Sequence, residues 1–477
     1  MKLSTTDIAG ILGAQCEMRP RGVRGYSIDS RQVQEGELFF AIRGAHRDGH
    51  DFVSEAFERG AAGAVVEAGH PRLSGQSSRS LIRVRDTTRA LQELAHAVRR
   101  QWGGRIVGIT GSTGKTTTKE IIAAVLARQY RVLKTSGNLN NHYGVPLTLL
   151  KLEPRHDVGV IEMAMSAPGE IAFLASLAEP GIGVVTNVAP AHLQFFDSVE
   201  SIARAKRELI EHLRAPAVAV LNHDDERVRH FADAFEGRVL TFGFEEGADF
   251  RALNVHMVQR GFPAMEFDVQ GGPYHERIAM SLVGRHNVQN ALAAIATASI
   301  FKISSENVCS ALSQFQALRQ RTEILKLAGD LTIIDDAYNS NPRAMESMLE
   351  TLAGWPGVRQ RIVVAGEMLE LGSSSPEWHR LVGRLCAQFG ADWLLAVQGD
   401  AKYLLEGAVG AGLPRERAMF FSDATEAGRF CQTVVRSGDV ILVKGSRGVG
   451  LEKAIDVLRR ELPVAPQQDL GLTVADK

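Results

Sequence analysis

Short apolar runs alternate along the chain with longer stretches in which apolar residues recur every three or four positions. The run Ile106–Thr110 is apolar and β-branched, as in a buried strand, and from Lys115 onward the apolar residues follow helical spacing. A short segment punctuated by Gly111 and Gly114 separates the two patterns. The sequence therefore predicts a strand, a tight turn and a helix in immediate succession.

The same alternation predicts strands and helices over most of the chain. Expected strands are residues 37–42, 64–67, 81–84, 106–110, 158–161, 183–186, 217–221, 239–243, 331–334, 361–365, 393–397 and 440–443. Expected helices are residues 4–12, 52–60, 87–102, 199–213, 291–299, 377–388 and 451–460, and residues 250–281 form an expected β-rich insertion. Strands that alternate with helices favour parallel sheets.

The composition is that of a globular protein. The chain has 477 residues, of which 45% are hydrophobic and 23% charged, with a formal net charge of −1. Such a charge gives no electrostatic case for binding nucleic acid or an anionic membrane. No apolar run reaches membrane-spanning length, and the first residues, MKLSTTDIAGILG, lack the pattern of a signal peptide. Because the four cysteines have no metal-ligand spacing, we expect reduced thiols in a cytoplasmic protein.

Residues 111–117, GSTGKTT, have the chemistry of a phosphate-binding loop. The glycines let the backbone approach an anion, and the helix N-terminus adds free N–H groups and positive potential. Lys115 can reach terminal phosphates and the Thr116 hydroxyl can bind Mg²⁺. Ile109 replaces the first glycine of the usual GxxxxGKS/T pattern, and a turn that binds nothing is the alternative, although this run has little packing rationale. We predict a nucleoside triphosphate site formed by Gly111, Ser112, Thr113, Gly114, Lys115, Thr116 and Thr117.

Length and alternation together predict three domains. We expect an α/β fold with a small α/β N-terminal domain at residues 1–86, a central P-loop-type ATPase parallel sheet at residues 87–318, and a C-terminal Rossmann-like doubly wound sheet at residues 319–477.

Polar residues follow several strands and loops of the central domain. Because ligands of parallel α/β sheets collect at the carboxyl ends of strands, we expect these side chains near the phosphate loop. They are Asn138, Asn140 and Asn141 in one loop, Glu162 after the strand 158–161, and Asn187 and His192 after the strand 183–186.

Individual residues of this group also have ordinary interpretations. Glu162 is a candidate Mg²⁺ ligand, because Mg²⁺ takes one or two carboxylates with phosphate and water, but a salt-bridged glutamate at a strand end is equally consistent with the pattern. His192 taken alone is typical of a structural histidine, and Lys206 of a solvated surface lysine. Asn287 and Asn290 share a helix face that could contact a base edge or cap the helix.

Ten segments in order resemble motifs of the Mur ligase family, the ATP-dependent amide-forming ligases of peptidoglycan precursor synthesis. They span about residues 25–460, and their common order and compatible spacing make the resemblance specific. The segments are DSR at 29–31, LFFAIRG at 38–44, TGSTGKTTTKE at 110–120, GNLNNHYGVPLTLL at 137–150, PGEIA at 168–172, VTNVAPAHL at 185–193, GRHNVQNALAA at 284–294, IDDAYNSNP at 334–342, GEMLELG at 366–372 and VKGSRGVGLE at 443–452.

The resemblance implies ATP and two Mg²⁺ ions at the phosphate loop. It implies that Thr116 and Glu162 hold one ion and that His192 helps to hold a second. Lys206 matches the lysine that family members N-carboxylate with CO₂, which turns a cation into a metal ligand.

The resemblance also implies nucleotide contacts from two domains. Asn290 is expected to contact adenine, Asp336 the ribose and Arg321 the terminal phosphate. The implied catalytic residues are Lys115, Lys206, His192 and Arg321.

More narrowly, the chain resembles the branch of the family that adds D-alanyl-D-alanine to UDP-N-acetylmuramoyl-tripeptide through an acyl phosphate. The resemblance assigns the uridine nucleotide to the first domain, ATP to the second and the dipeptide to the third, in a chain expected to be a monomer. Expected substrate contacts are Ser30, Arg43, His46, Asn138, Asn141, Asn341, Ser446 and Arg447.

Two positions depart from the family pattern, and other functions stay open. Ala164 stands in place of a glycine and Glu367 in place of an aspartate. Both substitutions are conservative, although Glu367 is expected to alter a contact near the dipeptide. The alternatives are a sister Mur ligase that adds a diamino acid, a folylpolyglutamate synthase-like ligase, and a regulatory NTPase switch, against which stands the absence of an NKxD segment.

Overall fold

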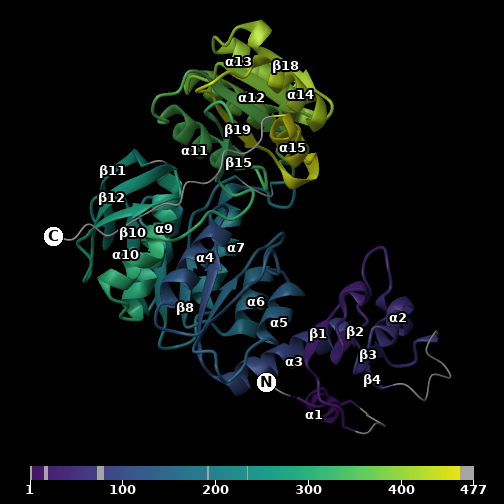
Figure 1. The fold of residues 1–477 in the computed structure, drawn as a ribbon. Helices are drawn as coiled ribbons and strands as arrows, with labels where there is room; N and C mark the ends of the chain where they lie inside the picture. Colours follow the sequence, from purple (N-terminus) through teal and green to yellow (C-terminus); the bar gives the residue numbers. More distant parts are fainter. Residues whose placement is uncertain are drawn as a thin grey trace.

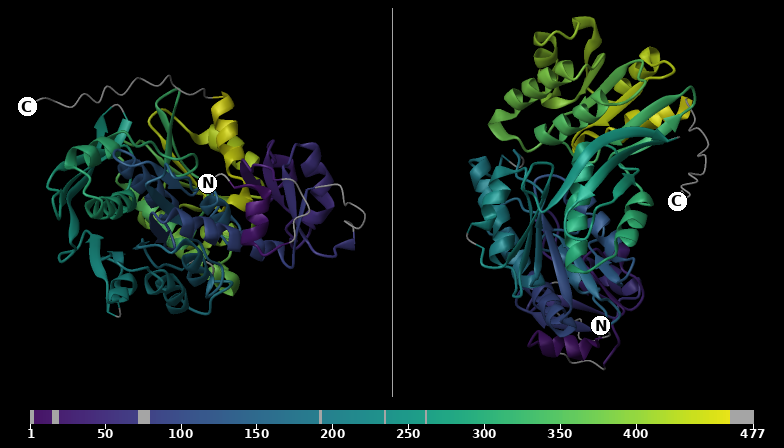
Figure 2. Two further views of the ribbon diagram at one scale, coloured as in Figure 1. Left: turned by 90° about the horizontal axis from the view of Figure 1, so that it is seen from below. Right: turned by 90° about the vertical axis from the view of Figure 1, so that its left-hand side faces the viewer.

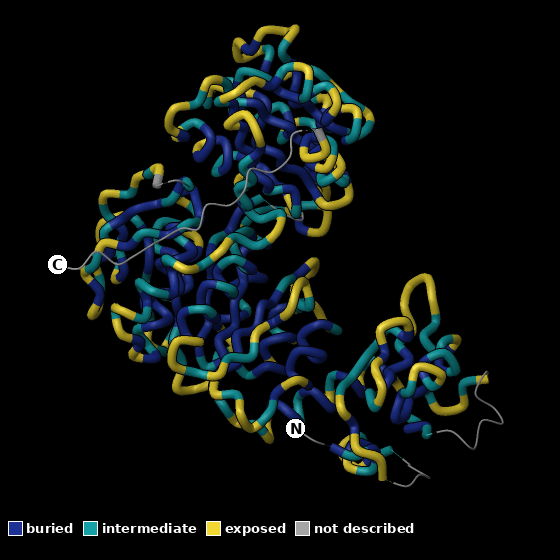
Figure 3. Tube along the Cα trace, in the orientation of Figure 1, coloured by how far each residue is buried: buried dark blue, intermediate teal, exposed yellow. Residues whose placement is uncertain are grey.

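The computed structural model describes residues 3–14, 20–71, 80–190, 193–233, 235–260 and 262–461. Its strands form three separate sheets of four, nine and six strands. These sheets follow one another along the chain, and the central body lies between the other two (Figure 1). Buried residues gather inside each body (Figure 3). The three-domain α/β architecture predicted from the alternating pattern is confirmed.

The N-terminal sheet contains four parallel strands in the order β1-β2-β3-β4. Successive residues of a strand face opposite sides, so Phe39 packs in the small core that contains α2, whereas Leu38 and Phe40 share a core with α3. The helix α3 also packs against helices of the central domain and so joins the two bodies. The elements are α1 (Thr5–Ile11), β1 (Gly25–Ser27), β2 (Glu37–Phe40), α2 (Val53–Glu58), β3 (Gly63–Glu67), β4 (Leu81–Val84) and α3 (Thr87–Trp102).

The central sheet has nine strands in the order β13-β12-β11-β10-β9-β8-β5-β7-β6. The pairs β11–β12 and β12–β13 are antiparallel and form the predicted β-rich insertion, whereas the other pairs are parallel. The strands are β5 (Arg105–Thr110), β6 (Val132–Lys134), β7 (Val158–Glu162), β8 (Ile182–Val185), β9 (Val218–Asn222), β10 (Arg238–Gly243), β11 (Phe250–Arg260), β12 (Phe262–Gln270) and β13 (Arg277–Met280).

Helices cover both faces of the central sheet (Figures 1 and 2). In β5, Val107 and Ile109 share a core with α4 and α9, whereas Ile106 faces the opposite core and Gly108 lies against Leu209 of α7. A strand buried on both faces needs a continuous apolar run, which is the pattern seen in the sequence. One face carries α4 (Lys115–Leu126), α9 (Arg285–Ile300) and α10 (Ser305–Ser313); the other carries α3, α5 (Gly144–Leu149), α6 (Glu170–Ala178) and α7 (Val199–Glu211).

The C-terminal sheet has six strands in the order β14-β15-β19-β16-β17-β18 and is doubly wound, as predicted. Ile334 and Val363 pack with one layer of helices, and their neighbours Ile333 and Val364 with the other. The strands are β14 (Glu323–Leu327), β15 (Leu331–Asp336), β16 (Arg361–Gly366), β17 (Trp393–Val397), β18 (Ala418–Phe421) and β19 (Val440–Lys444). The helices are α11 (Pro342–Ala353), α12 (Ser375–Gln388) and α13 (Lys402–Gly410) on one face, and α14 (Ala424–Val434) and α15 (Glu452–Glu461) on the other.

Four strands were not expected from the sequence: β1, β6, β14 and β18. Each lies at an edge of its sheet, and most of their residues are only half-buried. An edge strand has a neighbour on one side only and needs no continuous apolar run, so the hydrophobic pattern does not reveal it. The edge strand β14 also runs antiparallel to β15 in a sheet that is otherwise parallel.

The described helices include none that is both long and apolar enough to cross a membrane. Cys309, Cys386 and Cys431 are free thiols, as expected, and Cys16 lies outside the described residues. Burial raises the pKa of the Cys386 and Cys431 thiols to about 12, so both stay protonated near neutral pH.

A close contact between α12 and α13 depends on two glycines. A Cβ atom at Gly383 would lie 2.0 Å from the carbonyl oxygen of Leu404, and one at Gly407 would lie 2.0 Å from that of Arg380. Because the obstacle is backbone, Gly383→Ala must push the helices apart, and we expect it to lower the free energy of unfolding by about 1–3 kcal/mol. Thermal denaturation with calorimetry measures the effect.

The matched control is Gly410→Ala at the last residue of α13, where a Cβ atom would meet nothing within 4 Å. This variant should be neutral or slightly stabilised, because alanine is the better helix former. Equal stability of the two variants would contradict the close-packing argument.

Candidate active site

The phosphate loop, residues 111–117, connects the end of β5 to α4. Gly111 has φ +154° and Gly114, the N-cap of α4, has φ +78°. A Cβ atom at these two positions would lie 1.8 Å from Thr186 Oγ1 and 2.5 Å from Asn290 Oδ1, respectively. Glycine is therefore needed for space as well as for conformation, and the loop lies directly against the side chains that enclose it.

The residues after β8 fix the shape of the loop. Thr186 Oγ1 donates to the Thr113 carbonyl at 2.6 Å, and Asn187 Oδ1 accepts the Thr113 N–H at 2.9 Å. Ser112 Oγ donates to the Ala189 carbonyl at 3.0 Å. The start of α4, whose residues line a cleft, is thus held in a shape suited to an anion.

The Lys115 side chain folds back onto the backbone of this loop. Its Nζ donates to the Gly111 carbonyl at 2.7 Å and to the Ser112 carbonyl at 3.4 Å. Burial of the ammonium group lowers its pKa, an effect that Glu162 opposes and Arg321 reinforces. An arriving phosphate can replace the carbonyl acceptors and restore full charge compensation to the lysine.

Glu162 lies at the end of β7 and is 1% exposed. Its Oε1 accepts hydrogen bonds from Thr116 Oγ1 at 3.1 Å and Asn140 Nδ2 at 2.7 Å. Its Oε2 is buried without a hydrogen bond and lies 3.6 Å from Lys119 Nζ. A carboxylate with an unsatisfied oxygen beside a hydroxyl and a phosphate loop fits Mg²⁺, which prefers oxygen ligands of this kind.

Lys206 lies on α7 and is 2% exposed, so the ordinary interpretation as a surface lysine is wrong. Burial, reinforced by the charge of Lys115, lowers its pKa well below the usual value. A lowered pKa increases the share of the neutral amine, which is the form of lysine that reacts with CO₂. His192, the other candidate metal ligand on this side, lies outside the described residues.

Two asparagines of α9 form a chain of hydrogen bonds behind the loop. Asn290 Oδ1 accepts from Thr118 Oγ1 at 3.1 Å, and Asn290 Nδ2 donates to Asn287 Oδ1 at 3.1 Å. Asn287 Nδ2 donates in turn to the Val283 carbonyl at 2.8 Å. No side chain caps the N-terminus of α9, so the capping interpretation of Asn287 and Asn290 is wrong. Both residues line the cleft.

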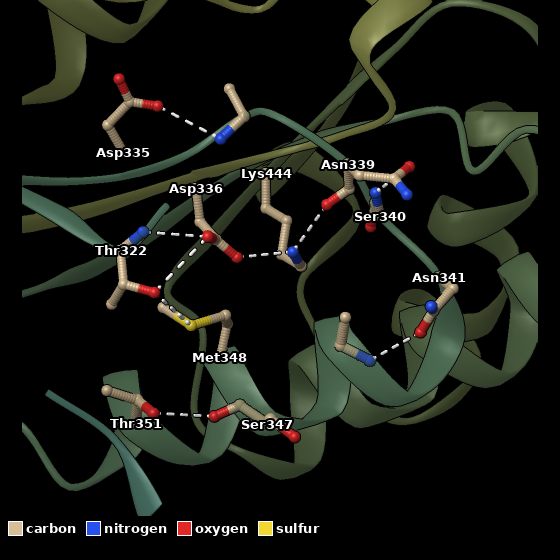
Figure 4. A network of polar contacts seen from close by, with 12 residues as sticks. Thr322, Asp335, Asp336, Asn339, Ser340, Asn341, Ser347, Met348, Thr351 and Lys444 are labelled. Atoms are coloured by element: carbon tan, nitrogen blue, oxygen red, sulfur yellow. Dashed lines mark hydrogen bonds and ion pairs between the residues drawn. The ribbon is translucent and has the colours of Figure 1, made fainter. Parts of the chain in front are cut away.

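The third domain contributes Asp336, at the end of β15, to the lining of the cleft. Figure 4 shows the polar contacts around this residue. Asp336 Oδ2 accepts from Lys444 Nζ at 2.5 Å, and Oδ1 accepts the Thr322 N–H at 2.9 Å. Lys444 also donates to the Asn339 carbonyl at 2.9 Å. Burial disfavours the ionised form of Asp336, but the charge of Lys444 outweighs it and keeps the pKa of the carboxyl below its usual value.

Two further predicted residues lie beside Asp336. The Arg321 guanidinium lies over the Tyr338 ring at 4.0 Å from its centroid, in a cation–π contact. Asn341 is the N-cap of α11, and its Oδ1 accepts the Ala344 N–H at 2.9 Å (Figure 4). Both residues line the cleft, and Asn341 also serves as a helix cap.

The cleft between the central and third domains has a volume of about 260 Å³ and gathers most of the predicted nucleotide site. Residues singled out from the sequence that line it are Ser112, Thr113, Gly114, Lys115, Thr116, Thr117, Asn138, Asn140, Glu162, Asn187, Asn287, Asn290, Arg321, Asp336 and Asn341.

Other predicted residues lie away from this cleft. Ser30 Oγ donates to Glu55 at 2.9 Å, Arg43 pairs with Glu67 at 2.9 Å and His46 is exposed, all in the N-terminal domain. Asn141 accepts from the Gly144 N–H at 2.9 Å at the start of α5. Ser446 Oγ accepts the Leu369 N–H at 3.0 Å, and the exposed Arg447 lies 5.5 Å from the Tyr338 ring centroid.

Sequence reasoning assigned no role to several residues of the cleft. Asn140 was expected near the phosphate loop, but its spacing does not distinguish it from the other two asparagines as the residue that donates to Glu162. Lys444 and His286 stand inside recognised motifs but had no assigned role. Burial lowers the pKa of His286 to about 4 and keeps this cleft residue neutral. Tyr338, also in the cleft, had no signal except its place in the segment at 334–342.

These features define a class: a three-domain α/β protein in which a glycine-rich loop of phosphate-binding type lines a cleft between the second and third domains. Three family models match in sequence order. They are "Mur ligase family, catalytic domain" at residues 22–99, "Mur ligase middle domain" at residues 109–298 and "Mur ligase, glutamate ligase domain" at residues 320–447.

The chain belongs to the Mur ligase family and is therefore a ligase. It is 34% identical to a Bacillus subtilis protein named UDP-N-acetylmuramoyl-tripeptide--D-alanyl-D-alanine ligase, over 91% of this chain and 92% of that one. A crystal structure of MurF from Acinetobacter baumannii matches with a TM-score of 0.87 and 29% identity, over 96% and 99% of the two chains. A MurF ligase from Thermotoga maritima in complex with ADP matches with a TM-score of 0.81 and 29% identity, over 92% and 98%.

A carboxyl next to the cleft makes stability depend on pH. Asp335 is 5% exposed, and burial raises its pKa to about 7. Its ordinary value is 3.8, so the folded state binds this proton more tightly, and stability falls as the pH rises from about 4 to 7. Asp335→Asn keeps the acceptor for the Ala337 N–H and should raise the melting temperature at pH 8 but not at pH 4, with a gain on the order of 2–4 kcal/mol at most.

The control is Asp456→Asn on the exposed side of α15. Calorimetric scans at pH 4 and pH 8 should show the same difference from wild type at both values. A pH-independent effect of Asp335→Asn would contradict the burial argument.

Proposed function

We propose that this ligase joins D-alanyl-D-alanine to UDP-N-acetylmuramoyl-tripeptide with ATP, giving the pentapeptide precursor, ADP and phosphate. The observation that carries the proposal is the cleft itself, in which a phosphate loop and the buried Glu162 face Asp336 and Arg321 of another domain. The names of the curated relatives support the choice of substrates.

ATP binds across the cleft in this proposal. The phosphate loop and Lys115 take the phosphates, Asn290 contacts adenine and Asp336 the ribose. Hydrogen bonds of 3.1 Å or less to neighbouring residues already fix the Asn290 and Asp336 side chains. These side chains therefore lose little conformational entropy when ATP binds. Arg321 lies across from Lys115, and the two charges stabilise the transferring phosphoryl group.

Thr116, Glu162, His192 and an N-carboxylated Lys206 would hold up to two Mg²⁺ ions. Bound Mg²⁺ reduces the repulsion between a carboxylate and a triphosphate. The neutral Lys206 amine forms a bond to the carbon of CO₂ and loses a proton, which gives a carbamate with one negative charge. The low pKa of buried Lys206 supports this modification.

The reaction then has two steps. The terminal carboxylate of the tripeptide attacks the γ-phosphorus, ADP leaves and an acyl phosphate forms. The dipeptide amine attacks the acyl carbon, loses a proton, and phosphate leaves as the amide forms. Closure of the domains excludes water from the acyl phosphate, which would otherwise hydrolyse.

The three domains divide the substrates in this proposal. Residues 1–86 bind the uridine nucleotide through Ser30, Arg43 and His46, residues 87–318 bind ATP, and residues 319–477 bind the dipeptide. Further substrate contacts are Asn138, Asn141, Asn341, Ser446 and Arg447. One chain carries every proposed group, so a monomer suffices, and the use of ATP favours a cytoplasmic location.

The direct test is phosphate release from ATP with UDP-N-acetylmuramoyl-tripeptide, in the presence and absence of D-alanyl-D-alanine, followed by mass spectrometry of the product. The proposal requires both substrates and a product heavier by the dipeptide minus water. Release only with a free amino acid in place of the dipeptide would move the chain to a sister ligase. Hydrolysis that needs no acceptor would indicate an NTPase switch.

Lys115→Ala should abolish turnover while the fold persists. The variant loses the cation next to the phosphates, and we expect a loss of at least about a hundredfold in kcat. Lys134→Ala, at a lysine whose side chain is 45% exposed, is the control and should retain activity. Near-normal activity of Lys115→Ala in the phosphate-release assay would remove the phosphate-loop assignment.

Lys206→Ala should be nearly inactive, and acetate or formate should restore part of the activity by supplying the missing carboxylate. Lys206→Arg is the matched control, because arginine is a basic side chain of similar length whose guanidinium does not form a carbamate. This control should be inactive with or without bicarbonate. Wild-type activity of either variant would refute the carbamate.

A further inference from the structure

Lys119 is a buried cation for which the proposed reaction has no use. It lies on α4, one helical turn after Thr116, and its side chain is 0% exposed. Burying an ammonium group is strongly unfavourable unless a negative charge compensates it. The position of Lys119 therefore calls for an anionic partner inside the protein.

Two carboxylates provide that compensation. Lys119 Nζ lies 3.1 Å from Glu120 Oε1 and 3.6 Å from Glu162 Oε2, and it forms no hydrogen bond. Glu120 is shared with Lys134, whose side chain is 45% exposed. The four charges balance, with Lys134–Glu120 as the outer pair and Lys119–Glu162 as the buried pair.

The two oxygens of Glu162 have different surroundings. Oε1 accepts hydrogen bonds from Thr116 and Asn140, at 3.1 Å and 2.7 Å. Oε2 has no hydrogen bond to any described residue. It forms an ion pair with Lys119. The ammonium thus lies next to the carboxylate oxygen that has no hydrogen bond, and its charge compensates that of Glu162. The same positive charge opposes any further cation that approaches the carboxylate.

We propose that Lys119 is a positioning residue that acts as the resident counter-cation of Glu162 and makes this metal site selective for a nucleotide-bound divalent ion over a free one. The inference rests on the proposed function, because it takes Glu162 as a ligand of the metal that accompanies ATP. Against Lys119, the carboxylate alone attracts a free divalent ion weakly. The negative charges of a nucleotide add enough attraction to outweigh the repulsion by Lys119, so the metal enters together with the phosphates.

The test measures binding of Mn²⁺ alone, as a spectroscopic probe, to the nucleotide-free full-length protein. Titration followed by electron paramagnetic resonance reports free Mn²⁺ directly. Lys119→Met removes the charge and keeps an unbranched apolar chain. It should bind free Mn²⁺ about tenfold or more tightly than wild type, because a unit charge close to the site is removed.

Two variants separate charge from structure. Lys134→Met makes the same change in net charge at the outer pair and should leave Mn²⁺ affinity within about twofold of wild type, because an exposed charge is screened. Lys119→Arg keeps the charge and should resemble wild type. A merely structural role of Lys119 would weaken metal binding when the residue is replaced, whereas the proposal requires stronger binding.

Glu162→Gln connects the effect to its partner. In the Lys119→Met background it should abolish the gain in Mn²⁺ affinity. In the wild-type background it should weaken binding of the Mn²⁺–ADP complex, which tests the metal assignment itself. If Glu162→Gln weakens Mn²⁺–ADP binding but Lys119→Met leaves free Mn²⁺ binding unchanged, the inference is wrong and the proposed function stands. If Glu162→Gln has no effect on Mn²⁺–ADP, the metal assignment fails and the inference with it.

A measurement on wild type covers the case in which Lys119→Met does not fold. The nucleotide-free wild-type protein should bind free Mn²⁺ at least about a hundredfold more weakly than it binds the Mn²⁺–ADP complex, which corresponds to two tenfold steps in the equilibrium constant. Comparable affinities would overturn the proposal.

Discussion

Charge buried beneath the phosphate loop is the constraint on which the rest of this structure depends. Lys119, Glu162 and Lys206 are at most 2% exposed, and burying charged groups is unfavourable unless neighbouring charges or hydrogen bonds compensate them. For Glu162 the fold supplies these partners. Thr116 and Asn140 donate hydrogen bonds to one carboxylate oxygen, and the Lys119 ammonium lies beside the other. The resulting set of charges is ready for phosphate and metal, since a ligand of opposite sign relieves the remaining imbalance.

A second constraint comes from the division of the site between domains. The central sheet presents the phosphate loop at the carboxyl ends of its parallel strands, and the third domain presents Asp336 at the end of β15. Lys444 reaches Asp336 from β19, the strand next to β15. The geometry of each half is therefore set inside its own domain, whereas the proposed reaction needs both halves together. The proposed reaction would gain from this arrangement, because a movement of one domain against the other would open and close the site around a hydrolysable intermediate.

Much of the fold follows from local sequence pattern. The strand, turn and helix at 105–126 and the helix α3 lie where the pattern placed them, because a strand buried on both faces and an amphipathic helix have distinct periodicities. The missed strands β1, β6, β14 and β18 are all at sheet edges, where one-sided pairing leaves no such pattern. Their pairing is decided by the sheets they join.

The sequence by itself determined the phosphate loop. Its function depends on local properties, namely the backbone conformations open to Gly111 and Gly114 and the reach of the Lys115 side chain. It also determined the order of α/β units, which repeats a local pattern. Only the tertiary structure decided that Asn140, rather than a neighbouring asparagine, holds Glu162, and that Lys119 and Lys206 are buried. The physical reason is that the burial of a charge and the choice of its partner depend on residues distant in the chain, and local spacing does not encode them.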